Sequence, residues 1–521
     1  MIFIIQLFKK RGFGGAFCRS NFWVVAAFLV LLNGCAHVNK PTAGVEKRYW
    51  IYIDTHELYD GETYAEQYVT ALLNYKVIDV DESVKLHIYA EHFEFDVDGK
   101  GYNSLKYRRQ EEFKTLMTQG FDVDFNPTDG SILAIHGRAT ELWDELLDSP
   151  MQKLLDMLTA PLVYPALPES LPVISQQDAL AATLFGHNVA ISVQANDAKY
   201  VSGLAKGKGV VGQVTTRHDS TWIEQLSLIV EESDASDSLT CTIHTYVIRP
   251  ANLPAVLMDN RWILRYQETI NWFDIRPIAQ AIMDAEEKAD SSILKREIGE
   301  IHFDDRDGEL TLAYQHNLES LQSLSLALRD IELVTENNEA VNLTALAGID
   351  QHFTSADTSY FPVRVYGWSS RPFDRQISNI SATLDYFPSE LTQTSFQWQP
   401  DVVEQHIDVA GLNLKIVATE RKGEYLLTYS PASGKWVEPY FEGLNGQYSF
   451  VIGTYDIDGL THEQSVQLSK LNQDGLQIAS EPVRFGYLFK LSEVPEQVSL
   501  LIRERATQPK TSNKVTFNRM D

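Results

Sequence analysis

The sequence contains few cysteines, and this scarcity excludes a disulfide framework. Only three occur in 521 residues, and they are Cys18, Cys35 and Cys241. The first lies in an N-terminal segment of distinct composition and the second directly after it, so Cys241 has no partner in the rest of the chain. The folded part must therefore be stabilised by hydrophobic cores alone. Several domains are expected, because single cores stop growing near ~250–300 residues.

Basic residues are scarce relative to acidic ones. The chain has 44 Lys and Arg against 71 Asp and Glu, a net charge of −27. A surface of this sign repels the phosphates of nucleic acids, so no nucleic-acid partner is expected. It also repels an anionic membrane surface, so adsorption through a basic patch is not expected either. The charge favours solubility and attracts cationic partners or divalent ions.

The first 34 residues differ from the rest of the chain. They contain Lys9, Lys10, Arg11 and Arg19 and no acidic residue, so their removal changes the net charge from −27 to −31. The apolar run at residues 22–32 has 11 residues. An α-helix needs about 20 to span a bilayer. A basic segment followed by a short apolar core predicts a secretory signal peptide at residues 1–34.

The apolar run ends in Leu32-Asn33-Gly34-Cys35 rather than in an Ala-x-Ala site. These residues resemble the lipobox of bacterial lipoproteins, with Leu at −3, a small residue at −1 and Cys at +1. The resemblance implies cleavage before Cys35 and lipid on that cysteine, which holds the protein on a membrane. Ala36 follows in place of Asp, which by the same resemblance implies the outer membrane. The alternative is an ordinary signal anchor with an incidental cysteine.

Residues 35–48 are polar and predict a lipidated tether. Residues 49–297 mix strand and helix signals and predict an α+β module with a curved antiparallel sheet and helices. Strand signals lie at 50–53, 84–90, 121–125, 131–135, 189–193, 213–217, 226–231, 238–248 and 262–272. Helix signals are the spacing of Tyr64, Tyr68, Ala71, Leu72 and Tyr75, a capped start at Ser149 and a segment opened by Pro277.

From residue 298 the helical signal nearly vanishes, and short segments alternate apolar with polar residues. This pattern predicts two immunoglobulin-like β-sandwiches at residues 298–400 and 401–506. The echo of residues 362–365 in residues 482–485 is either a trace of duplication or chance. Residues 507–521 are polar and predict a frayed, flexible tail.

Several motifs invite a chemical interpretation that their context does not support. Residues 207–212 match G-x-G-x-x-G, but a strand pattern follows where a dinucleotide site needs a helix, so a hairpin is predicted. Residues 122–126 begin like a calcium loop, but Pro127 and Leu133 replace the required Gly and Glu. The acidic turns at 304–309 and 456–459 are interpreted as solvated turns, with Ca²⁺ binding as the alternative.

No pattern assigns a catalytic, metal-binding or cofactor-binding residue. His87 and His92 are five apart and fall on opposite faces of one strand. The sequence has no H-E-x-x-H or G-x-S-x-G motif. Cys241, in a strand pattern, is interpreted as a small core residue. The tryptophans of the β-rich regions are interpreted as core residues, with stacking on sugars or peptides as the alternative. They are Trp262, Trp272, Trp368, Trp398 and Trp436.

These observations favour a lipid-anchored envelope protein that acts as a binding or scaffold module without catalysis and without a cofactor. Its expected partners are the membrane, through lipid on Cys35, and an envelope protein or glycan. Two alternatives stay open. One is an envelope-polymer hydrolase that uses paired carboxylates. The other is a carrier of an apolar ligand held in the N-terminal module.

Overall fold

The computed structural model divides into two compact units. The first contains the chain up to Glu94 together with Arg108–Leu226 and Val230–Pro250, and the second contains Phe95–Tyr107, Ser227–Ile229 and Ala251–Asp521. The structure describes residues 42–97, 100–105, 111–126, 132–147, 180–184, 187–196, 200–217, 222–233, 239–251, 273–274, 294, 296–303, 309–316, 326–335, 343–347, 353–355, 358–369, 377–399, 404–409, 411–419, 421–429, 435–440, 446–452, 460, 464, 468, 485–493 and 497–519.

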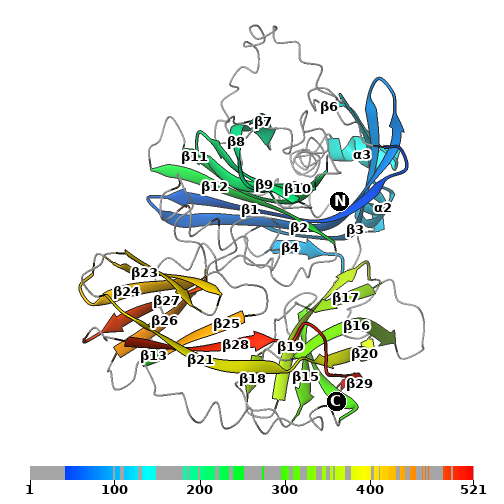
Figure 1. Ribbon diagram of the computed structural model, residues 1–521. Coiled ribbons are helices and arrows are strands. Elements are labelled where there is room, and N and C mark those ends of the chain that lie inside the picture. The colour runs from blue at the N-terminus through cyan, green and yellow to red at the C-terminus, as the bar shows by residue number, and fades with distance from the viewer. Residues whose placement is uncertain are drawn as a thin grey trace. The chain divides into compact units, whose positions relative to one another are not determined.

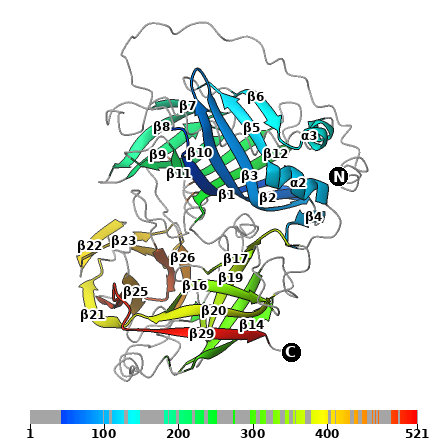
Figure 2. The same cartoon turned by 90° about the vertical axis from the view of Figure 1, so that its right-hand side faces the viewer.

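The first unit contains most of a twelve-stranded, strongly curved sheet (Figures 1 and 2), of which residues 95–97, 100–103 and 227–229 are grouped with the second unit. Its spatial order is β6 (Ile132–Gly137), β5 (Phe121–Phe125), β3 (Val84–Val97), β2 (Glu62–Val80), β1 (Glu46–Tyr59), β12 (Thr240–Pro250), β11 (Ile223–Ser233), β10 (Val210–Arg217), β9 (Tyr200–Gly207), β8 (His187–Asn196) and β7 (Leu180–Leu184), with β4 (Lys100–Asn103) beside β3. The central strands β1 and β12 pair antiparallel over their full length.

Two short helices pack on β3 and β5. The helices are α2 (Glu111–Gln119) and α3 (Thr140–Leu147). Phe113 of α2 makes an edge-to-face contact with Phe93, and Trp143 of α3 lies 5.3 Å from Phe121, measured between ring centroids. Gly120 ends α2 with a positive φ of 69° and donates its N–H to the Leu116 carbonyl, as is common at a helix C-terminus.

The helix predicted from Tyr64 to Tyr75 is wrong, because these residues lie in the 19-residue strand β2. Its residues from Val69 to Tyr75 are all buried, on both faces of the strand. A strand covered on both faces has no apolar–polar alternation. Apolar residues on both faces therefore produced the spacing of a helix by coincidence. The helices predicted after Ser149 and Pro277 lie outside the described residues.

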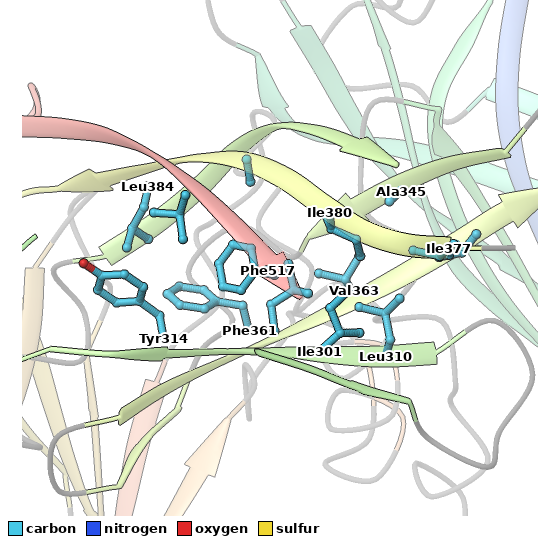
Figure 3. Packing of buried hydrophobic residues seen from close by; sticks show 14 of the residues in the cluster. Ile301, Leu310, Tyr314, Ala345, Phe361, Val363, Ile377, Ile380, Leu384 and Phe517 are labelled. Carbon is cyan, nitrogen blue, oxygen red and sulfur yellow. The ribbon is translucent and has the colours of Figure 1, made fainter. Parts of the chain in front are cut away.

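The second unit contains an eight-stranded sheet of order β16 (Leu326–Thr335), β20 (Ile377–Tyr386), β29 (Thr511–Arg519), β14 (Ile298–Phe303), β15 (Glu309–Gln315), β19 (Thr358–Gly367) and β17 (Leu343–Ala347), with β18 (Phe353–Ser355) beside β19. Side chains from strands across this sheet form one core, in which Phe517, Phe361 and Ile380 point toward one another (Figure 3). The strands that surround this core thus belong to one continuous sheet.

The flexible tail predicted at residues 507–521 contains an interior strand, so this prediction is wrong. Strand β29 pairs antiparallel with β20 and parallel with β14. Val515 and Phe517 are fully buried in the core of the sheet. The sequence did not indicate a strand here because β29 has only two large apolar residues, with polar residues on either side.

The second unit also contains a β-sandwich. One layer has six strands in the order β13 (Phe273–Asp274), β26 (Gly446–Ile452), β27 (Phe485–Leu491), β24 (Glu424–Tyr429), β23 (Leu412–Ala418) and β22 (Glu404–Val409). The other has β21 (Ser389–Gln397), β28 (Gln497–Arg505) and β25 (Lys435–Tyr440). Residues of both layers share one core, including Leu414, Tyr429 and Leu500.

Except for β13, the sandwich is inserted between two strands of the eight-stranded sheet. Strand β20 ends at Tyr386, which pairs with Thr511 at the start of β29, and Ser389 of β21 pairs with Arg505 of β28. Between them, Ala506 N–H donates to the Pro388 carbonyl at 2.9 Å. The domain boundary predicted at residue 400 therefore lies between β21 and β22, which are strands of the same sandwich.

The chain is thus mostly β, with several sheets, as the alternation after residue 298 predicted. Many predicted strand segments lie within observed strands. Examples are residues 84–90 in β3, 189–193 in β8 and 226–231 in β11. The predicted strand at 262–272 lies outside the described residues.

Candidate functional site on the curved sheet

The two faces of the curved sheet differ in chemistry. Cross-strand pairing places Lys47, Tyr49, Ile51, Ile53 and Thr55 of β1 on one face with the residues opposite them in β2 and β12. The intervening residues of β1 point to the other face. We call the first the apolar face and the second the polar face.

The apolar face is lined by buried aliphatic and aromatic side chains. Its central part is formed by Ile51, Ile53, Val69, Ala71, Leu73, Tyr246 and Ile248. Each of these is no more than 7% exposed. From Lys47 to Thr55 the face extends over eight residue steps of β1, or about 27 Å at ~3.4 Å per residue. These buried side chains therefore form a layer of hydrophobic core along this side of the sheet.

One end of the apolar face carries an ion pair and two tyrosines, and we call it the Lys47 end. Lys47 Nζ lies 3.3 Å from Glu224 Oε1, with the two side chains 27% and 14% exposed. Tyr49 donates its hydroxyl to the Ile223 carbonyl at 2.6 Å. Tyr75, opposite Lys47, contacts the Tyr49 ring edge-on, and its hydroxyl has no hydrogen-bond partner among the described residues. Burial raises the pKa of both tyrosines, so both hydroxyls stay protonated.

The opposite end carries a group of three ionisable residues and a threonine that we call the rim cluster: Thr55, His187, Glu232 and His244. His244 Nδ1 lies 3.0 Å from Thr55 Oγ1. The Glu232 carboxylate lies between two imidazoles, 3.8 Å from His244 Nε2 and 3.8 Å from His187 Nε2. These distances are too long for direct hydrogen bonds but suit a bridging water or ligand atom. The Glu232 side chain is 55% exposed, so the cluster is accessible.

Burial and neighbouring charges set the protonation of the rim cluster. Burial lowers the pKa of His244, the nearby His187 lowers it further, and Glu232 and Glu57 oppose the shift. His244 is therefore neutral at pH 7, with one ring nitrogen available as an acceptor. Burial and Glu232 together raise the pKa of Tyr246 to about 12. The cluster thus combines a carboxylate with the neutral imidazole of His244, which can donate or accept hydrogen bonds.

The polar face contains ionisable pairs that are closed to solvent. His56 Nε2 lies 3.0 Å from Asp54 Oδ2, and both side chains are under 5% exposed. Tyr68 donates its hydroxyl to Glu94 Oε1 at 2.8 Å. Arg249, which is 2% exposed, donates to the carbonyl oxygens of Leu226 and Ile248. These contacts satisfy buried polar groups.

Nearer β5, the polar face is more open. Asp122 accepts from Arg138 Nε at 3.0 Å and lies 2.9 Å from His87 Nδ1. Burial and the Arg138 charge lower the pKa of His87, against the opposing effect of Asp122. Asn74 donates to Glu91 at 2.7 Å, and Glu91 also pairs with Arg48. Each carboxylate already has a cationic or amide partner, so these pairs support the sheet.

The residues singled out from sequence fall mostly away from these clusters. Cys35, the one predicted site residue, lies outside the described residues, as do most residues of the two acidic turns. His87 has Asp122 as its partner, whereas His92 is buried against the Trp50 ring. Residues 207–212 form the end of β9, a turn at 208–209 and the start of β10, so the hairpin interpretation is confirmed.

Cys241 is half-buried rather than part of a core. Its sulfur lies 3.8 Å from Glu231 Oε1, and burial together with this carboxylate raises the pKa of the thiol. It is thus a poor nucleophile. Of the predicted core tryptophans, Trp398 is buried at 5% exposure, which confirms the prediction there, and Trp368 is half-buried.

Sequence reasoning missed both ends of the apolar face. The rim cluster joins residues of β1, β8, β11 and β12 that are far apart in the chain, and no local spacing signals them. Tyr75 was assigned to a helix. Among the described residues, His, Cys, Asp and Glu form no group of three suited to hold a metal ion. In the same parts of the chain, no helix is long and apolar enough to cross a membrane.

Comparison with known proteins gives no family. No family model and no curated protein matches the sequence. A solved structure titled "Lipid-protein interactions in lipovitellin" aligns with 40% of this chain and 25% of its own, at 9% identity and a TM-score of 0.27. The structure of P47 from Clostridium botulinum A2 aligns with 88% of this chain and 97% of its own, at 8% identity and a TM-score of 0.10. The matched part thus spans a quarter of the first structure's length.

Proposed function

We propose that the protein is a lipid-anchored protein of the bacterial outer membrane, which acts by binding rather than by catalysis. The lipobox-like residues around Cys35 support the anchor. The observation that supports a binding role is the rim cluster. It places the exposed Glu232 carboxylate 3.8 Å from each of two partly exposed imidazoles, a separation that a water or a ligand atom can bridge. We also propose the finer fold classes, α+β for residues 49–297 and immunoglobulin-like for the sandwich.

The anchor is tested by replacing Cys35 with Ser and following membrane fractionation and incorporation of labelled fatty acid. The wild type is expected to incorporate the label and stay with the membrane, and Cys35→Ser is expected to lose both. If Cys35→Ser stays membrane-bound and the wild type incorporates no labelled fatty acid, the protein is not anchored by lipid on Cys35.

The binding role is tested by in vivo cross-linking and co-purification of the full chain. Glu232→Gln removes the rim carboxylate and is expected to reduce recovery of the partner. Glu231→Gln is the matched control, because Glu231 is the adjacent residue and its carboxylate contacts Cys241 instead. Equal recovery with both variants would remove the rim cluster from the interface. Absence of any specific partner, combined with turnover of a glycan or peptide, would favour a hydrolase instead.

A further inference from the structure

We propose that the rim cluster, together with the neighbouring Glu57, Tyr59 and Tyr64, binds a segment of a protein partner that is rich in lysine or arginine. We call these residues the rim surface. The proposal rests on the partner-binding role proposed above and names the chemical class of the partner.

The apolar face leaves the hydrophobic core at the end of β1. Strand β1 pairs with β12 without a shift of register as far as Tyr59, so Glu57 and Tyr59 lie on the same face as Thr55. Thr55 is 7% exposed, whereas Tyr59 is 51% exposed. Glu57, between them, is half-buried. The last side chains of this face are therefore accessible to a partner without any opening of the fold.

Two exposed aromatic rings lie on this part of the sheet. Tyr64 is 61% exposed and is the extra residue of a bulge in β2, opposite Glu57 and Leu58 of β1. The Glu57 carboxylate accepts a hydrogen bond from the Tyr64 hydroxyl and raises its pKa, which places Tyr64 beside Tyr59 on the same face. Exposed tyrosine rings attract ammonium and guanidinium groups, and their apolar parts pack against the aliphatic stems of lysine and arginine.

The carboxylates of the rim surface have no basic partner of their own. Among the described residues, neither Glu57 nor Glu232 forms an ion pair with a lysine or an arginine. Elsewhere on the sheet, Glu91 and Asp122 each have an arginine partner. The charges of Glu57 and Glu232 both act on His244, which is neutral at pH 7, so the negative charge around it is not compensated. A cationic partner supplies the missing charge.

The spacing of these carboxylates favours a segment with several basic side chains. Glu57 lies on β1 and Glu232 on β11, with β12 between them, so their backbones are about 10 Å apart. Basic side chains two residues apart in an extended segment are separated by about 7 Å, so one segment reaches both carboxylates. Lys208, in the turn between β9 and β10, pairs with neither carboxylate in the described part of the chain. A protein segment also provides apolar atoms for the tyrosine rings.

The test is fluorescence anisotropy of a labelled, blocked tetralysine peptide titrated with the purified full chain. A salt concentration of about 0.1 M screens charges more than about 10 Å apart. The wild type is expected to bind this peptide, to bind it more tightly than spermine, which carries the same positive charge, and not to bind a blocked tetraglutamate peptide.

Glu232→Gln is expected to weaken binding of the tetralysine peptide about twofold to fivefold, the contribution of one exposed ion pair. The matched control is Glu231→Gln, which makes the same change of charge at the adjacent residue, whose carboxylate contacts Cys241. It is expected to bind as the wild type does. Tyr64→Leu is expected to weaken binding about twofold to fivefold because it removes the ring, whereas Tyr64→Phe keeps the ring and the affinity. These positions are exposed, so the thermal midpoints are expected to match that of the wild type.

Equal weakening by Glu231→Gln and Glu232→Gln would mean that the peptide senses only the overall charge, and would overturn the proposal. So would unchanged binding in Tyr64→Leu, or an affinity for spermine equal to that for the peptide. If the peptide does not bind, but Glu232→Gln still lowers recovery of the partner in cells, the partner is not cationic and the binding role of the rim cluster stands.

Discussion

Replacing Phe517 with Ala tests whether the C-terminal strand is structural. Phe517 is fully buried and lies in the core of the eight-stranded sheet, where Phe361 and Ile380 face it (Figure 3). The backbone of Gly299 also packs closely on its ring. Truncation of a buried phenylalanine costs about 3–5 kcal/mol in free energy of unfolding. This is a large fraction of the roughly 5–15 kcal/mol that stabilises a typical domain.

Hydrogen exchange measured by mass spectrometry can show which strands are affected by this loss of stability. Peptides from β14, β20 and β29 are expected to lose protection in Phe517→Ala, because β29 lies between the other two strands and pairs with both. Peptides from β1 and β12 of the first unit are expected to keep theirs. The control is Asn518→Ala, since Asn518 is exposed and such a change alters stability by no more than about 0.5 kcal/mol. Unchanged protection in Phe517→Ala would show that residues 511–519 are frayed after all.

Two further predictions concern titratable groups. Cys241 is expected to react with iodoacetamide at pH 7 more slowly than a free thiol, because its raised pKa reduces the thiolate fraction, and Glu231→Gln is expected to speed the reaction. Equal rates in the two proteins would exclude the carboxylate as a cause. For His244, the folded-state pKa lies below the ordinary 6.5, so the unfolded chain binds the proton first and stability falls as the pH drops below about 6.5. His244→Gln is expected to flatten this part of the urea-midpoint profile, and an unchanged slope would contradict the assignment.

The sequence predicts strands well where one face of a sheet is covered and the other is not. Strand β23 is an example, since Leu412, Leu414 and Ile416 are buried and the residues between them are more exposed. The prediction is wrong for strand β2 because both of its faces are buried, so its apolar residues do not alternate with polar ones as on a half-buried strand. The prediction is wrong for strand β29 for the opposite reason, since two buried residues are too few to show an alternation of apolar and polar residues.

The candidate site was unpredictable for a different reason. The rim cluster depends on which strands are neighbours, and the order of the twelve strands is a property of the whole sheet. Glu231 and Glu232 illustrate this. They are adjacent and chemically identical, yet the first contacts Cys241 and the second contacts His244 and His187. Only the pairing of β11 with β12 decides which of them joins the cluster.

The inserted sandwich leads to a prediction about the modularity of the second unit. Its two connections run side by side, because Ala506 N–H donates to the Pro388 carbonyl and Lys510 N–H donates to the Tyr386 carbonyl. Deleting residues 389–505 and joining Pro388 to Ala506 leaves seven residues between the paired Tyr386 and Thr511. Loop closure over so few residues costs little entropy compared with the 124 that separate this pair in the intact chain.

The shortened chain is therefore expected to keep the protection of β20 and β29 against hydrogen exchange, as in the intact protein. A matched control deletes residues 511–519 instead, which removes β29 from between β20 and β14 and is expected to abolish protection of both. Should the first deletion also abolish protection, the sandwich would be required for the eight-stranded sheet to fold. The two would then form one cooperative unit, despite their separate cores.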